Sequence, residues 1–146
     1  MSSTLKEALD FATRKEREAE TFYRTWSSQA SNPVVKKLFS ELAEAERGHA
    51  EKLSRITPED LIAQGDAPPD LRLSDYLVAV EPQTGMSLQD ALIIAMKREE
   101  TAVALYERLS QLPGNVQSLF VALAQEERRH KCLLEAEYDE VVLTEN

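Results

Sequence analysis

The sequence has only one cysteine, Cys132, and contains few glycines and prolines, four and six respectively among 146 residues. A single cysteine excludes an intrachain disulfide and also excludes a four-cysteine iron or zinc site. No apolar run approaches the roughly 18 residues of a membrane-spanning helix, and residues 1–11 lack the basic and apolar regions of a secretion signal. We therefore expect a cytoplasmic protein with no membrane partner.

Basic residues are also scarce, since 17 Lys and Arg stand against 26 Asp and Glu, for a formal net charge of −9. Nucleic acids bind basic surfaces, so we expect no nucleic-acid partner. Hydrophobic residues make up 42% and charged residues 29% of the chain, as in an ordinary globular protein. The length suffices for one domain with a full core, which we expect to span residues 1–146.

Four long segments have apolar residues at spacings of three and four, the period of an amphipathic helix. Each segment also begins at a recognisable start signal. The predicted helices run to about residue 30 from the Thr4–Glu7 capping box, to about residue 56 from Asn32-Pro33, to about residue 112 from the Ser87–Asp90 cap, and from the turn at residues 113–115 to about residue 137.

The segment from residue 57 to residue 86 is different, because prolines and glycines interrupt it repeatedly. A short helix is predicted within it, from Leu73 to Val80. The tight turns near residues 31 and 114 make antiparallel helical hairpins, whereas this longer segment can cross the length of a bundle. The sequence therefore predicts an all-α antiparallel four-helix bundle with one long crossover between its second and third helices.

The two halves of the chain repeat each other. Residues 15–23 match residues 98–106 at an offset of 83, and residues 38–53 match residues 119–134 at an offset of 81. The two lost residues fall in the turn between paired helices, where changes of length are tolerated. We therefore expect two helical hairpins related by an approximate twofold axis.

Both histidines lie in this repeat, in the same Glu-x-x-His frame, and residues three apart share a face of a helix. The apolar stripes of the other two helices each pass through one Glu. Four buried carboxylates without partners would each cost several kcal/mol, but two divalent cations would balance their charge. This is the ligand set of di-iron carboxylate bundles. The predicted metal ligands are Glu16, Glu46, His49, Glu99, Glu127 and His130.

Carboxylate and imidazole ligands suit iron or manganese, and we expect two divalent ions, with iron first and manganese or zinc as alternatives. Tyr23 and Tyr106 lie seven residues after Glu16 and Glu99, two turns along the same face. They are either amphipathic core residues or hydrogen-bond partners of the ligand carboxylates.

Other candidate residues are assigned to less specific roles. Glu20 lies one turn beyond a predicted ligand and is assigned to solvent. Glu100 and Glu126 each adjoin a ligand but point about 100° away from it, so both are assigned to the surface. Cys132 is assigned as an inert buried or boundary thiol.

The motifs KEREAETFY, AEAERGHAEKL, MKREETAVALY and AQEERRHKCLL resemble the rubrerythrin branch of the ferritin-like superfamily, over about residues 3–137. The resemblance implies a ferritin-like domain, the six metal ligands above, and Tyr23 and Tyr106 as their hydrogen-bond partners. It also implies reduction of hydrogen peroxide at a diferrous site. Two features depart from that family: the four-cysteine rubredoxin-type domain is missing, and Ala102 replaces a usual extra carboxylate.

We expect a non-haem di-iron oxidoreductase, an enzyme of the peroxidase or oxidase type that reduces hydrogen peroxide or dioxygen. Because the chain lacks a cysteine-based electron relay, its reductant must be an external electron-donor protein, and we expect a homodimer. One alternative is an iron-binding or ferroxidase protein for iron storage or handling. Another is a helical bundle in which zinc or other ions serve only the structure.

Overall fold

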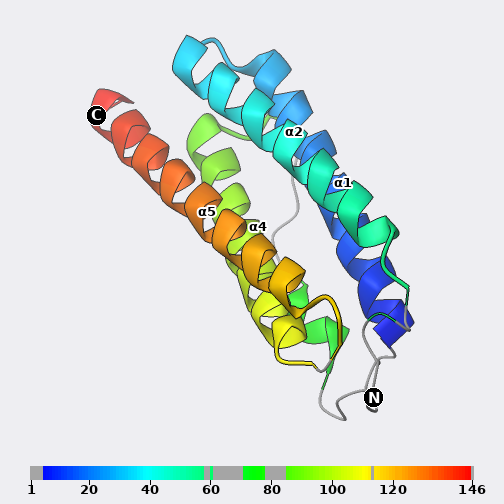
Figure 1. Cartoon of the computed structure of the whole chain (residues 1–146). Helices are drawn as coiled ribbons and strands as arrows, with labels where there is room; N and C mark the ends of the chain where they lie inside the picture. Colours follow the sequence, from blue (N-terminus) through cyan, green and yellow to red (C-terminus); the bar gives the residue numbers. More distant parts are fainter. Residues whose placement is uncertain (1–4, 58–59, 61–70, 78–84, 113, 146) are drawn as a thin grey trace.

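The computed structural model describes residues 5–57, 60, 71–77, 85–112 and 114–145, and it contains four long helices (Figure 1). The helices are α1 (Leu5–Gln29), α2 (Pro33–Ser54), α4 (Leu88–Ser110) and α5 (Gln117–Glu145), with a short 3₁₀ helix, η1 (Leu73–Tyr76), before α4. These described ranges contain no strand. The predicted all-α four-helix bundle is confirmed. None of the helices in these ranges combines the length and apolar character of a membrane span.

The bundle consists of two helical hairpins, with α1 packed along α2 and α4 packed along α5 (Figure 1). Contacts between the hairpins are much sparser than contacts within them. The sequence repeat therefore corresponds to two hairpins, and anything held between them must join the two halves of the chain.

The predicted start signals of α2 and α4 act as helix caps. The Asn32 side chain accepts hydrogen bonds from the backbone N–H groups of Val34 and Val35, at 2.8 Å and 3.3 Å. The Ser87 hydroxyl accepts one from the backbone N–H of Asp90 at 3.1 Å. These bonds satisfy donors that the first turn of a helix leaves unpaired. The predicted capping residue Thr4 lies outside the described residues.

Two boundaries differ from the prediction. The last helix was expected to end near residue 137, but α5 continues to Glu145. Tyr138 and Val141 extend its apolar stripe by steps of four and three residues from Leu134, and they pack against the same core. The short helix predicted from Leu73 is a 3₁₀ helix that ends at Tyr76, and residues 78–80 lie outside the described part.

Two apolar clusters fill the bundle, one toward each end. One joins the first half of α1 and the end of α2 to the second half of α4 and the start of α5. The other joins the second half of α1 and the start of α2 to the first half of α4 and the second half of α5. Between the clusters lies a central layer to which every long helix contributes polar side chains, and this layer holds the predicted metal ligands.

Candidate metal centre

Six buried polar side chains occupy the middle of the bundle, and they are the six predicted ligands. Each is at most 3% exposed. One comes from α1, one from α4 and two each from α2 and α5, where the spacing of three residues directs both side chains inward. The six are Glu16, Glu46, His49, Glu99, Glu127 and His130.

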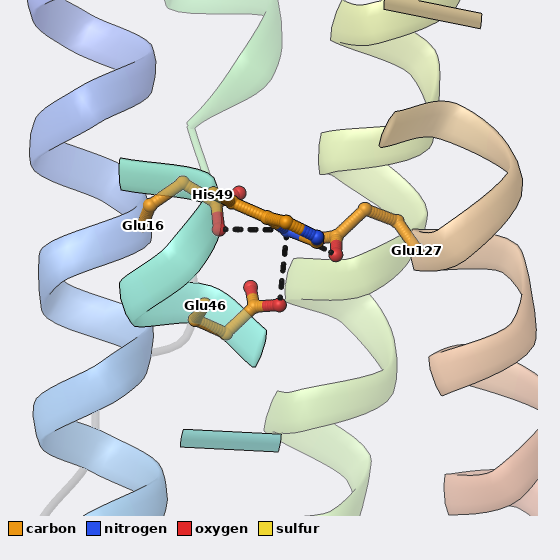
Figure 2. A group of neighbouring side chains, drawn as sticks. All are labelled: Glu16, Glu46, His49 and Glu127. Atoms are coloured by element: carbon orange, nitrogen blue, oxygen red, sulfur yellow. Dashed lines mark ion pairs between the residues drawn. The ribbon is translucent and has the colours of Figure 1, made fainter. Parts of the chain in front are cut away.

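Three carboxylates surround the inner nitrogen of His49. Its Nδ1 lies 3.3 Å from Oε2 of Glu16, 3.5 Å from Oε1 of Glu46 and 3.1 Å from Oε1 of Glu127. Figure 2 shows Glu16 and Glu127 approaching the ring from opposite sides, with Glu46 completing the group. The four residues offer ligand atoms that all lie within 4.8 Å of one another.

A second group of four forms around His130. Its Nδ1 lies 3.3 Å from Oε1 of Glu46, 3.2 Å from Oε1 of Glu127 and 3.7 Å from Oε1 of Glu99. The Oε1 atoms of Glu46 and Glu127 therefore face both imidazoles, whereas Glu16 and Glu99 each serve one group. The geometry is that of two adjacent cation positions joined by two shared carboxylates.

The side-chain oxygen and nitrogen atoms that face this layer lack hydrogen-bond partners. Seven buried side-chain atoms within the described residues make no hydrogen bond, and all seven belong to the six residues. Buried polar atoms of native proteins are nearly always paired. Two divalent cations would supply these atoms with partners and would balance four negative charges, so the residues fit a dinuclear metal site. Oxygen and imidazole donors suit iron and manganese, and also zinc.

Two tyrosines each hold one oxygen of an unshared carboxylate. Tyr106 donates a hydrogen bond of 2.7 Å to Oε1 of Glu16, and Tyr23 donates one of 2.7 Å to Oε1 of Glu99. Each bond crosses from one hairpin to the other. The Oε2 atom of both glutamates stays buried and unpaired. Each tyrosine thus fixes the orientation of one carboxylate. In Glu16 the unbonded Oε2 faces His49, whereas in Glu99 the bonded Oε1 also faces His130.

The protonation of the shared carboxylates depends on this crowding. Burial raises the pKa of Glu46 and of Glu127 well above the ordinary value of a glutamate, and the neighbouring carboxylates raise it further. Burial alone would lower the pKa of His130, but the adjacent Glu46 and Glu99 carboxylates outweigh it and raise the value to about 9. Without cations, the layer therefore retains protons.

A seventh residue, Glu126, touches the site although its position in the sequence predicted a surface role. Its side chain is 48% exposed, yet its carboxylate contacts Nε2 of His49 on the other hairpin. Helical geometry directs Glu126 away from the predicted ligands of its own helix, α5. It does not decide which side chains of α2 the residue can reach. The repeat gave no signal either, because the matching residue is Ala45.

The remaining candidate residues of the sequence lie away from the centre. Glu20 forms ion pairs with Arg24 at 3.0 Å and Arg17 at 3.8 Å. Glu100 is largely exposed, with its nearest charged partner, Lys131, at 4.0 Å. Cys132 is a free, exposed thiol, so its predicted buried or boundary position was wrong. On α5, His130 and Leu134 face the core, and Cys132 lies between them on the outer side of the helix.

A small cavity leads to the carboxylate side of the centre. It has a volume of about 50 Å³ and lies between α1 and α4. All four ligand glutamates line it, and neither histidine does. Small and apolar side chains line much of the rest, among them Phe11, Ala12, Ala19, Ala102 and Leu105, together with the charged residues Lys15, Glu18 and Arg98.

Comparisons with known proteins agree with this geometry. The family model described as Rubrerythrin matches residues 7–138. A structure from Thermotoga maritima, described as that of a ferritin-like diiron-carboxylate protein, is similar with a TM-score of 0.76 and 26% sequence identity. The match covers 96% of this chain and 97% of that chain. No curated protein matches the sequence.

Proposed function

The chain belongs to the rubrerythrin family, and we propose that it is a non-haem di-iron oxidoreductase that reduces hydrogen peroxide or dioxygen. The observation that carries the proposal is the pair of four-residue groups that share Glu46 and Glu127. Such sharing would hold two cations next to each other. Two iron ions bound there would supply Lewis acidity and two electrons for one oxidant molecule.

The protein residues would position and shield this chemistry. Tyr23 and Tyr106 hold the terminal carboxylates, so Glu99 and Glu16 each keep one oxygen directed at the site. The two apolar clusters keep bulk water from both ends of the central layer. The histidines lie on the side away from the cavity, which leaves the carboxylate side open to an incoming molecule.

The size of the cavity favours a small oxidant. A buried water needs at least about 10–15 Å³ of such space, and this cavity offers about 50 Å³. A peroxide or dioxygen molecule would fit within that volume. The cavity therefore supports an oxidant of two oxygen atoms as the substrate.

Electrons must reach the site from elsewhere. The only cysteine is Cys132, so the chain has no set of cysteines for an iron–sulfur relay. We propose an external electron-donor protein as the reductant and a homodimer as the assembly. The mass of the iron-loaded protein in solution tests the assembly, because a large closed shell would instead favour iron storage.

The test of function is anaerobic loading with Fe(II), followed by separate stopped-flow mixing with hydrogen peroxide and with dioxygen. We expect two Fe(II) per chain, an oxo-bridged diferric absorption after mixing, and return to the diferrous form on reduction. Glu46→Ala removes a carboxylate that both groups share, so it should prevent loading of both positions.

Three other results would contradict the proposal. Oxidation of many Fe(II) ions per chain into a retained mineral would identify an iron-storage protein. A site that binds zinc and gives no diferric absorption after iron loading would identify a structural centre. Equal iron loading of the wild type and Glu46→Ala would place the metal elsewhere.

A further inference from the structure

The repeat makes the inner nitrogens of the two histidines equivalent but leaves their outer nitrogens different. Nε2 of His49 contacts the carboxylate of Glu126. His130 makes its carboxylate contacts, within the described part of the chain, through Nδ1. The position that corresponds to Glu126 at the offset of 81 is Ala45, which has no carboxylate to offer.

The contact between Glu126 and His49 is specific in its geometry. It joins α5 of one hairpin to α2 of the other, between the two apolar clusters to which both helices contribute. The His49 side chain is 3% exposed, whereas that of Glu126 is 48% exposed. The glutamate therefore reaches a buried ring from the surface, while its chain neighbour Glu127 points into the centre.

A carboxylate at this position changes what the imidazole can do. If Nδ1 binds a cation, the proton of the neutral ring must lie on Nε2. A carboxylate that accepts this proton in a hydrogen bond fixes the tautomer and the ring orientation, and it raises the basicity of the ligand. His49 has such a partner, and Ala45 provides none for His130.

We propose that Glu126 is a positioning residue that makes the two metal positions unequal, so that the ion bound through His49 is held more tightly than the ion bound through His130. The inference rests on the proposed dinuclear site and adds an order to its loading. Loss of such an outer partner typically weakens metal binding about 10–100-fold.

The test is anaerobic titration with Co(II), followed by absorption and calorimetry, on the wild type, Glu126→Ala and Glu100→Ala. The control Glu100 is also a glutamate beside a ligand, but it is largely exposed and its nearest charged partner is Lys131. We expect two unequal steps for the wild type. Glu126→Ala should weaken the tighter step about 10–100-fold and leave the other nearly unchanged, and Glu100→Ala should alter neither.

A second readout reports the hydrogen bond itself. In the Zn(II)-loaded protein, the Nε2–H proton of His49 should give an NMR signal that exchanges slowly with water. This signal should be lost in Glu126→Ala and retained in Glu100→Ala. Glu126→Ala also removes the partner of a buried nitrogen, so the titrations and spectra are recorded well below the melting temperatures of all three apoproteins.

The outcomes separate this inference from the proposed function. Fewer than two Co(II) per wild-type chain would overturn the dinuclear site itself. Two Co(II) per chain with unchanged affinities in Glu126→Ala would overturn the role of Glu126 alone. Equal weakening of both steps, or the same loss in Glu100→Ala, would also overturn it, because a general charge effect would then explain the data.

Discussion

At the scale of single residues, each unshared ligand carboxylate has two oxygens with different surroundings. Oε1 of Glu16 accepts the hydrogen bond of Tyr106, while Oε2 is buried and unpaired. Oε1 of Glu99 likewise accepts the hydrogen bond of Tyr23, and its Oε2 is buried and unpaired. The tyrosines thereby orient both carboxylates, and they also tie the two hairpins together.

Tyr106→Phe should destabilise the metal-free protein by about 1–3 kcal/mol, because it leaves Oε1 of Glu16 buried without a partner. Urea unfolding of the chelated protein measures the change. The matched control is Tyr138→Phe, since Tyr138 lies at the edge of the core, and it should change the free energy of unfolding by less than about 0.5 kcal/mol. Equal stability of Tyr106→Phe and the wild type would contradict the structural role of this bond.

The six central residues could be predicted from the sequence, but the contact of Glu126 with His49 could not. The six central residues share a pattern, since a repeated frame and apolar stripes direct them all inward. The contact of Glu126 depends on how α5 lies beside α2, which no spacing within one helix reveals. For Tyr23 and Tyr106 the sequence left two roles open, and the hydrogen bonds place both hydroxyls on ligand carboxylates.

At the scale of elements, helix starts were more predictable than helix ends. The cap of α2 depends on local hydrogen bonds that the Asn32 side chain accepts from the first turn, and on a proline at the start of the helix. The end of α5 depends instead on Tyr138 and Val141 packing into an apolar cluster that all four long helices form. That contact is tertiary, and the charged residues between the two positions conceal the continued stripe in the sequence.

Asn32→Ala should lower the free energy of unfolding by about 0.5–2 kcal/mol, because the first turn of α2 loses its acceptor. Asn32→Asp keeps an acceptor of similar length and should stay close to the wild type. Chemical unfolding of the three proteins at one pH gives the comparison. If the Ala and Asp variants lose equal stability, the cap does not contribute as the geometry indicates.

The cavity between α1 and α4 depends on small residues in both helices, among them Ala102. Ala102→Phe should fill much of its volume of about 50 Å³ and slow the oxidation of the iron-loaded protein by peroxide at least about tenfold, a barrier increase of about 1.4 kcal/mol. The number of iron ions per chain should stay at that of the wild type. Stopped-flow absorption measures the rate.

Ala122 of α5 is exposed, so Ala122→Phe adds the same side chain away from the cavity. This control should react at the wild-type rate. An unchanged rate in Ala102→Phe would show that the oxidant reaches the site by another path.

At the scale of the whole molecule, the chain carries a net charge of −9 and encloses four of its carboxylates at its centre. The central layer lies between two apolar clusters, and both clusters also join the two hairpins. Four buried negative charges without partners would oppose folding, so protons or metal ions must neutralise the layer. The stability of the molecule should depend on which of the two is present.

The chelated protein should lose stability as pH rises. Folding raises the pKa of Glu46 and Glu127 well above 4.5 and that of His130 from 6.5 to about 9, so the folded state binds more protons than the unfolded state throughout this range. Stability is then greatest at low pH and falls from about pH 4.5 upward, with the His130 part lost between pH 6.5 and about 9.

The metal-loaded protein should show the opposite slope over neutral pH, because ligands release protons when they bind cations and binding tightens as pH rises. We would measure the melting temperature of the protein in chelator and in excess Zn(II) at intervals from about pH 5 to 9, the range in which the raised pKa values act. This gives one curve of melting temperature against pH for each form. They should diverge steadily with pH and lie closest at the acidic end. A chelated protein whose melting temperature stays constant and equals that of the loaded form would mean that the four glutamates are solvated, and the central layer would then not be the buried metal centre described above.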